Sequence, residues 1–297
     1  MTLASTSTLP SLAKRRPSLV RRASSALHRR PRLRLGLLLS GPLLWLGVAY
    51  IGSLVALLVT SVRPAGSQLS GGVTAQNFID VTKHAYPAVA RRTVGVAAAV
   101  TVIDLVLALP VAFYMAKIAS TRVRRLLVVA VLMPLWASYV VKGYAWRTLL
   151  DPAGGVLRKT FKVTPGYGLS ATVIVLAYLW LPYMVLPIYA GLERLPDSLL
   201  EASADLGGKA GVTVRSVVLP LLLPAIVAGS IFTFSLSLGD YITVGLVGGK
   251  TQMIGNVISR NFGANNIAFA AAFATVPVVI MVVYLLAARR TGAFENL

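Results

Sequence analysis

Apolar stretches about as long as a bilayer is thick recur along the whole chain, and this feature limits the fold more than any other. A hydrocarbon core of about 30 Å takes roughly 20 residues of α-helix to cross. Six stretches come close to that length with few or no charged residues: 35–62, 93–116, 126–146, 169–192, 217–239 and 267–288. They fill most of the 297 residues, so no length remains for a soluble catalytic domain. We therefore expect an all-α, polytopic membrane protein of six transmembrane helices.

The composition and charge of the chain agree with a bilayer as solvent. Hydrophobic residues make up 56% of the sequence and charged residues 13%. The net charge of +20 would suggest a nucleic-acid partner in a soluble chain, but the basic residues lie between the apolar stretches and before residue 35. We attribute them to topology and to contact with anionic membrane lipid, with no nucleic acid bound. With no cysteine and two isolated histidines, the sequence predicts no metal site.

The domain boundaries follow from the same pattern. Residues 1–34, rich in Ser, Pro and Arg without an apolar period, are predicted to form a disordered cytoplasmic tail. A cleaved signal peptide is the alternative. The stretch 35–62, however, has 28 residues without a charge, longer than a signal core, and we expect it to remain as the first span. Residues 35–288 then form the transmembrane domain, and 289–297 a short cytoplasmic tail.

The distribution of lysine and arginine indicates the orientation. With a cytoplasmic N-terminus, the inner segments hold 18 of these residues and the outer loops ten. This bias places both termini in the cytoplasm. Without the tail the count falls to nine inside against ten outside, so the orientation depends on the tail. Loops 63–92 and 147–168 would then lie on the outer face, and the loop 193–216 inside.

Some residues inside the spans are expected to affect the helices themselves and not to line a path for a solute. Lys142 would oppose a cationic solute and is predicted to extend its ammonium group to the outer interface. Prolines inside the spans predict kinks, which membrane helices tolerate. They are Pro42, Pro110, Pro134, Pro182, Pro187, Pro224 and Pro277.

The loop 193–216 is the most informative segment, because an apolar chain here offers four acids and three bases. Its local signals predict a short helix of about nine residues. Ser198 and Glu201 have the spacing of a capping box, and Gly207 with Gly208 supplies the left-handed residue that ends many helices. A helix this short does not persist alone in water. We therefore expect it to dock on another surface.

Two kinds of surface compete for this helix. Glu201 and Asp205 lie four residues apart and share one face, and an apolar strip beside them can form from Leu199, Ala202 and Leu206. An amphipathic helix on lipid headgroups normally carries basic residues on its polar face, whereas anionic lipid would repel these acids. A protein surface is the favoured partner.

The loop also resembles the signature of the permease subunits of ABC importers, which reads Glu-Ala-Ala, three residues, Gly, nine residues and Ile-x-Leu-Pro. The matching residues, with every spacing kept, are Glu201-Ala202-Ser203, Gly207 and Val217-Val218-Leu219-Pro220. Ser203 and Val217 depart from the signature, and each is similar in size to the residue it replaces. The resemblance covers roughly residues 85–290 and leaves out the tail.

That resemblance implies a type I ABC importer permease fold in a bacterial cytoplasmic (inner) membrane, with the loop as a cytoplasmic coupling helix. The implied partners are two copies of an ABC ATPase, a second homologous permease in a heterodimer and an extracytoplasmic solute-binding protein. ATP and Mg would bind to the ATPase, so we expect no cofactor and no catalytic residue on this chain. The near-match to a phosphate loop at 245–251 lacks the first glycine and a strand–loop–helix context. The ATPase-coupling residues would be Leu199, Glu201, Ala202, Asp205, Leu206 and Gly207.

A second segment resembles the spermidine/putrescine subfamily of these permeases, which implies a polyamine as the solute. Its residues are Gly239-Asp240-Tyr241-Ile242-Thr243, Val247-Gly248-Gly249 and Met253-Ile254-Gly255-Asn256-Val257-Ile258. Polyamines are extended polycations, and carboxylates and aromatic faces can replace their water, each cation–π contact contributing about 0.5–2 kcal/mol. Another small solute, such as an amino acid, a sugar or an anion, is the alternative, since related permeases share parts of this segment.

Five residues are candidates for the solute path: Asp240, Tyr241, Trp136, Tyr139 and Asp104. An acid at membrane depth is costly enough to suggest a function. Asp240 ends a span beside Tyr241, and its alternative role is a helix end hydrated by the outer water layer. For Asp104 the alternative is a pair or hydrogen bond with a neighbouring helix or the partner subunit. For Trp136 and Tyr139 the alternative role is a place in an interfacial aromatic belt or packing between helices.

Three other functions compete with an importer subunit. A secondary transporter or channel working alone would leave the acidic loop helix unexplained. A membrane enzyme would need a catalytic constellation, whereas the acids are scattered and no histidine lies beside them. A structural anchor would need no charges inside its spans.

Overall fold

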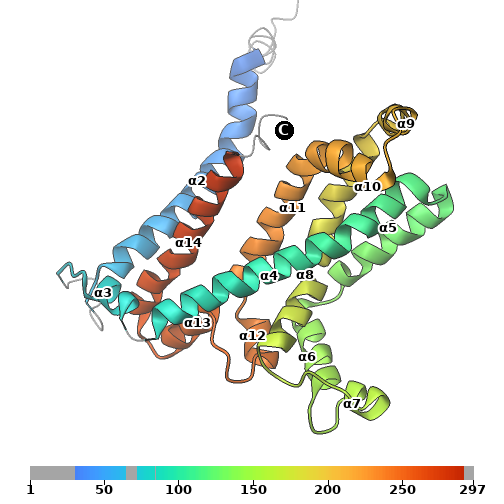
Figure 1. Cartoon of the computed structure of the whole chain (residues 1–297). Helices are drawn as coiled ribbons and strands as arrows, with labels where there is room; N and C mark the ends of the chain where they lie inside the picture. The colour runs from blue at the N-terminus through green and yellow to red at the C-terminus, as the bar shows by residue number, and fades with distance from the viewer. Residues whose placement is uncertain (1–30, 65–71, 84, 291–297) are drawn as a thin grey trace, which may run out of the picture. The chain divides into compact units, whose positions relative to one another are not determined.

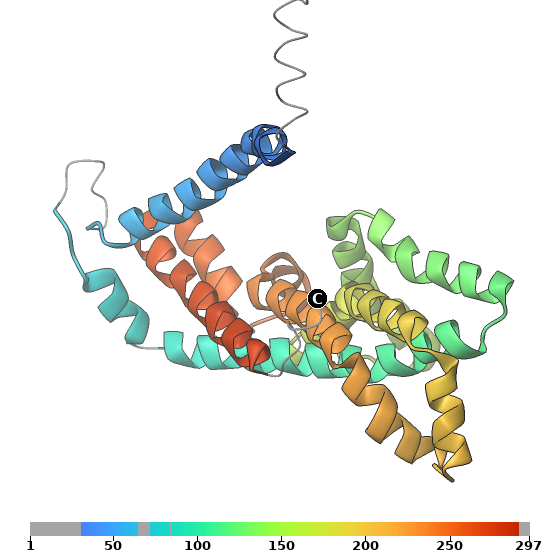
Figure 2. The same cartoon turned by 90° about the horizontal axis from the view of Figure 1, so that it is seen from above.

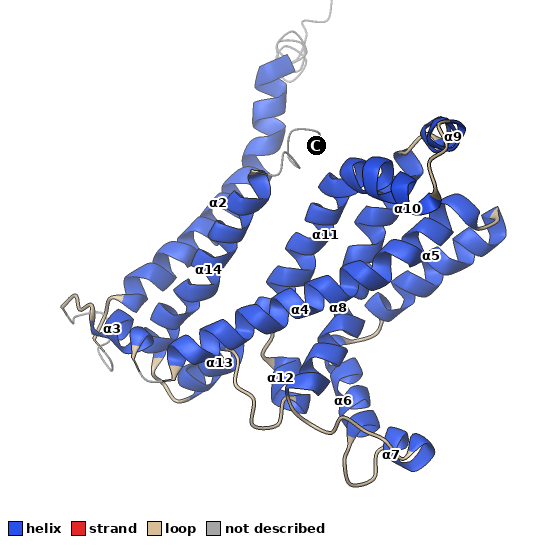
Figure 3. Cartoon of the chain, viewed as in Figure 1, coloured by secondary structure: helices blue, strands red, loops and turns tan. Residues whose placement is uncertain are grey.

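The computed structural model describes residues 31–64, 72–83 and 85–290. Every regular element in these ranges is a helix, and they contain no strand (Figure 3). Most of the predicted cytoplasmic tail and the predicted C-terminal tail beyond residue 290 lie outside the described residues. An all-helical chain agrees with the fold class expected from the sequence.

The chain divides into two compact units, residues 1–56 and 57–297. Most of α2 (Pro31–Ser61) belongs to the first unit, and it has Pro42 in its interior. Its part from Leu38 onward is apolar and long enough to cross a membrane, as predicted for the first span. The helix begins inside the segment that the sequence assigns to the tail.

The second unit is built on four long apolar helices, each of which coincides with a predicted span. They are α4 (Tyr86–Phe113), α8 (Leu169–Arg194), α11 (Leu219–Gly239) and α14 (Ile267–Arg289). Two of them include a π-helical turn at the end nearest the loop 193–216. These turns are η1 (Tyr114–Ile118), which continues α4, and η2 (Val214–Val218), which joins α10 (Ala210–Thr213) to α11.

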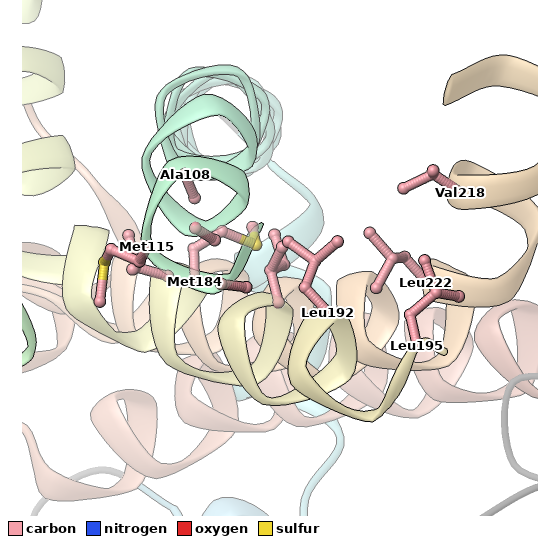
Figure 4. Close-up of a cluster of buried hydrophobic side chains, with 11 residues drawn as sticks. Ala108, Met115, Met184, Leu192, Leu195, Val218 and Leu222 are labelled. Carbon is pink, nitrogen blue, oxygen red and sulfur yellow. The ribbon is translucent and has the colours of Figure 1, made fainter. Parts of the chain in front are cut away.

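The core of this unit lies where α4, α8 and α11 pack together, and α4 runs across both partners when the molecule is seen from above (Figure 2). Small residues allow the close approach, as is common between membrane helices. A Cβ atom at Gly229 of α11 would lie 2.8 Å from the Met184 Sδ of α8, and one at Gly191 would lie 2.9 Å from the Ala225 Cβ. Buried side chains from all three segments form one cluster (Figure 4): Ala108, Met115, Met184, Leu192, Leu195, Val218 and Leu222.

The third predicted span, 126–146, is not one continuous helix. Instead α5 (Thr121–Trp136) and α6 (Tyr139–Leu150) meet at 93°, and the chain has six spans if this bent pair counts as one. The helix breaks shortly after Pro134, which leaves the Pro134 carbonyl without a helical donor. The Lys142 ammonium donates to that carbonyl at 2.9 Å. Lys142 therefore forms a hydrogen bond across the bend, whereas the sequence predicts that its ammonium group extends to the outer interface.

Short helices lie at both ends of the bundle. One end holds α9 (Asp197–Asp205) with α10 (Figure 1). The sequence did not predict helices in the loop 240–266, where α12 and α13 occur. The short helices at the end opposite α9 are α3 (Gln76–Thr82), α7 (Val156–Phe161), α12 (Ile242–Val247) and α13 (Ile254–Gly263).

Replacing Gly229 with alanine should loosen the contact between α8 and α11. The added methyl group would lie 2.8 Å from the Met184 Sδ and 3.2 Å from the Met184 Cα, so the two backbones must separate. We expect a loss of about 1–3 kcal/mol in thermal unfolding of the detergent-solubilised chain. Gly95→Ala in α4, where no atom lies within 4 Å, is the matched control and should be neutral or stabilising by up to about 1 kcal/mol. Equal stability of the two variants would contradict the packing described.

Candidate functional site

The C-terminal end of α9 is built as the sequence predicts. The helix has nine residues, and Gly207 follows it with a φ of 78°. The Gly207 amide donates to the Ala204 carbonyl and the Gly208 amide to the Ser203 carbonyl, each at 2.8 Å. This pair of bonds is the Schellman motif, which favours glycine in the left-handed position. The predicted length of the helix and the prediction that Gly207 ends it are confirmed.

The N-terminal end of α9 differs from the prediction. The helix begins at Asp197 with Pro196 before it, so Ser198 lies inside the first turn and the capping-box prediction is wrong. Asp197 supplies a negative charge in that turn, which favours the N-terminus of a helix. Its carboxylate pairs at 2.6 Å with Lys117, a residue from the π-helical end of α4.

The side chains predicted to couple to an ATPase lie on an open face of α9. No residue of the helix is buried, and Leu206 just after it is 90% exposed. Glu201, Ala202 and Asp205 are also exposed, whereas Leu199 is partly exposed and faces α8 and α11 across a pocket. Ser203, by contrast, points inward, and its hydroxyl lies 2.8 Å from the Thr213 hydroxyl. The face is therefore available to a partner, and its coupling role stays a prediction.

A pocket of about 480 Å³ separates the start of α9 from the helices behind it. Leu199 closes it on one side, and residues of α8 and α11 close it on the other. Its lining residues are Pro187, Ala190, Gly191, Arg194, Leu195, Pro196, Leu199, Pro220, Leu221, Pro224, Ala225 and Ala228.

The second candidate site is centred on Asp240, which directly follows α11 at the end of the bundle opposite α9. The residue is 6% exposed. Its Oδ2 accepts a hydrogen bond from the Tyr139 hydroxyl, and its Oδ1 accepts one from the Thr243 amide at 2.8 Å. Because the tyrosine proton points to the carboxylate, the Thr243 hydroxyl, 2.6 Å away, donates to the Tyr139 oxygen. The structure thus brings two predicted path residues, Tyr139 and Asp240, into contact.

Aromatic rings and a pocket of about 310 Å³ lie beside this carboxylate. Trp180 of α8 stacks on Tyr139, with 5.7 Å between ring centroids and 14° between planes. Tyr183 and Phe232 continue the row at centroid distances of 5.9 and 6.1 Å. The row follows α8 from the Asp240 end of the bundle toward α9. The pocket is lined by Tyr139, Trp180, Ser235, Leu236, Gly239, Asp240, Tyr241 and Ile242.

The other predicted path residues have different surroundings. Tyr241 lines the pocket and is half-exposed, whereas Trp136 is exposed at the end of α5, before the bend. Asp104 of α4 is fully buried, and neither carboxylate oxygen has a hydrogen-bond partner among the described residues. None of the described helices therefore supplies the hydrogen bond that is the alternative role for Asp104.

Two residues of the Asp240 cluster were not among the predicted path residues. The Thr243 amide lies three residues after Asp240, a spacing at which an aspartate before a helix commonly accepts a backbone hydrogen bond, but its hydroxyl contact with Tyr139 has no local signal. Trp180 lies on another helix, and nothing local in the sequence connects it with Tyr139.

Residues 85–290 match the family described as "Binding-protein-dependent transport system inner membrane component". The chain belongs to this family. The matched range agrees with the range over which the sequence resembles ABC importer permeases, and it includes both α9 and the Asp240 cluster.

Known relatives and solved structures agree with this membership. The inner membrane ABC transporter permease protein YdcU of Escherichia coli (strain K12) is 42% identical, over 90% of this chain and 92% of its own length. The spermidine/putrescine transport system permease protein PotB of the same strain is 30% identical, over 75% of this chain and 84% of its own. A bacterial alginate ABC transporter, solved with an alginate-bound periplasmic protein, aligns at a TM-score of 0.71 with 14% identity, covering 90% of this chain and 96% of its own.

The chain is therefore an ABC importer permease, a transport subunit that spans an inner membrane. Its fold is the one expected from the sequence. Alginate is an acidic polysaccharide and spermidine a polycation, yet both names occur among these similar proteins. The shared fold alone therefore does not indicate the solute.

Removing the Tyr139 hydroxyl should destabilise the Asp240 cluster. Tyr139→Phe deletes one of the two donors to a buried carboxylate, and we expect a loss of about 1–3 kcal/mol in thermal unfolding in detergent. Tyr144→Phe, on the exposed side of the same helix, is the control and should change stability by less than about 0.5 kcal/mol. The assignment fails if the two variants unfold alike.

Proposed function

We propose that this permease forms half of the translocation pathway of an ATP-driven importer for polyamines such as spermidine and putrescine. A separate ATPase hydrolyses ATP, and two of its copies drive alternating access through the coupling helices. The second half of the pathway is a homologous permease in a heterodimer, and an extracytoplasmic binding protein delivers the solute. Both termini and α9 face the cytoplasm. The Asp240 pocket faces the opposite side.

The open acidic face of α9 is the observation that supports an ATPase partner. A nine-residue helix needs a docking surface, and within this chain α9 is held by Leu200 and by polar contacts at its two ends. Its exposed acids, Glu201 and Asp205, disfavour anionic lipid as the occupant. The periplasmic protein in the alginate transporter complex supports the delivery of solute from the other side.

The Asp240 pocket is the observation that supports a cationic solute. Its carboxylate is fixed by Tyr139 and Thr243, so the negative charge is positioned before a solute arrives. Trp180 and Tyr241 add aromatic faces, which attract ammonium groups with about 0.5–2 kcal/mol per contact. The PotB relatives favour the same class of solute, whereas the name of the more similar YdcU specifies none.

Substitutions at two signature residues, Glu201 and Gly207, should release the ATPase without disturbing membrane insertion. Gly207→Pro removes the amide that binds Ala204 and cannot adopt a positive φ, while Glu201→Lys reverses a charge on the exposed face. We expect both to abolish uptake and co-purification of the ATPase subunit. Gly207→Asn, which tolerates the left-handed conformation, should retain both.

A matched control for the charge reversal is Asp80→Lys on α3, at the other end of the bundle. It should leave ATPase co-purification unchanged. Wild-type uptake with Glu201→Lys and Gly207→Pro would rule out α9 as the coupling element.

The solute can be tested by ATP-dependent uptake of labelled putrescine into proteoliposomes that contain the complete transporter. Spermidine should compete, and a sugar or an anion should not. Trp180→Leu should raise the apparent KM about tenfold, equivalent to roughly 1.4 kcal/mol, whereas Trp180→Phe keeps an aromatic face and should remain within about threefold. Competition by a sugar or an anion, with none by polyamines, would overturn the solute assignment.

A further inference from the structure

A single lysine connects three segments at the α9 end of the bundle. The Lys117 ammonium lies 2.6 Å from the Leu195 carbonyl, at the end of α8, and 2.6 Å from the Asp197 carboxylate, at the start of α9. Lys117 itself belongs to η1, the last turn of the α4 span. Its side chain is 11% exposed, against 75% for the Asp197 side chain. The stem of the lysine is therefore mostly covered, while its ionic partner is largely exposed.

The π-helical turn sets the direction of this lysine. The Ala119 amide donates to the Tyr114 carbonyl, five residues earlier, instead of to the carbonyl four residues earlier. One extra residue in a turn rotates everything after it by about 100°. Lys117 thus points along a direction that a regular continuation of α4 would not give.

Arg124 holds the same turn in place from α5. Its Nε and Nη2 each donate at 3.0 Å, to the carbonyls of Met115 and Ala116. Its Nη1 lies 3.8 Å from the Glu193 Oε1 near the end of α8. The backbone that carries Lys117 is therefore fixed on both sides.

The contact between α9 and the bundle is incomplete behind the first turn of the helix. A pocket of about 480 Å³ lies there, between Leu199 and the prolines Pro220 and Pro224 of α11. Leu200 packs against the buried cluster of the bundle, and the hydroxyls of Ser203 and Thr213 connect the other end of the helix to α10. The polar contacts at the two ends of α9 therefore add to a small apolar contact with the bundle.

We propose that Lys117 is a positioning residue of the transport cycle, one that fastens the start of α9 to the end of α4. A displacement of α9 then moves α4 and α8 together with α11, instead of bending the short link at Pro196. The inference rests on the proposed coupling of α9 to an ATPase, and it adds α4 to the elements that α9 drives directly.

The test is the ratio of solute uptake to ATP hydrolysis in proteoliposomes that contain the complete transporter. Lys117→Met removes the charge at similar length and should lower this ratio about five- to tenfold, at equal co-purification of the ATPase. Lys117→Arg should restore much of it, and Arg122→Met, on the exposed start of α5, should leave it unchanged. A wild-type ratio with Lys117→Met overturns the inference. If the wild-type transporter itself shows no ATP-driven uptake, the proposed function fails instead.

A distance measurement distinguishes positioning from a loss of folding. The chain has no native cysteine, so spin labels at Ser120→Cys and Ala204→Cys report only the separation of the α4 end from α9. The wild type should give one narrow distribution with and without ATP, and Lys117→Met a broad one. An equally narrow distribution in the variant overturns the inference. Where Lys117→Met does not assemble, Asp197→Asn removes only the ion pair and should lower the uptake ratio about twofold. An unchanged ratio of uptake to ATP hydrolysis in Asp197→Asn would also overturn the inference.

Discussion

A helix that ends inside or beside a bilayer needs donors for its last carbonyl groups, and this requirement explains where several basic side chains lie. Lys142 binds the Pro134 carbonyl at the bend between α5 and α6. Arg124 binds the carbonyls of Met115 and Ala116 at the end of the α4 span. Residues that a simple charge count assigns to topology thus also act as fixed hydrogen-bond donors. The geometry of both candidate sites depends on them.

The two candidate sites handle acidic groups in opposite ways. On α9 the carboxylates of Glu201 and Asp205 are exposed, so any surface that covers them must replace their hydration. At the other end, Asp240 has two internal donors and little exposed surface. A carboxylate satisfied in this way keeps its position without water. The acids of α9 therefore depend on what surrounds the chain, whereas the position of Asp240 is set by the chain itself.

Length and apolar content predicted four of the long helices of the second unit, because a helix that crosses lipid must be apolar over most of its length. The break after Pro134 was not visible in the sequence, since both arms are apolar and prolines such as Pro110 and Pro182 leave their helices continuous. The end of α9 was predictable because its glycine motif is local. Its start was not, because Asp197 pairs with a lysine 80 residues away. The contact between Tyr139 and Asp240 spans 101 residues and likewise requires the packed fold.

The bend itself divides the third span into two mechanical parts. α5 contacts η1 and α8, whereas α6 packs mainly on α12, beside the Asp240 pocket. Between them the backbone at Ala137 and Ser138 is not helical. Rotation about these two residues would break no backbone hydrogen bond within either helix, but it would separate the Lys142 ammonium from the Pro134 carbonyl. One side-chain hydrogen bond therefore holds the angle between the two helices.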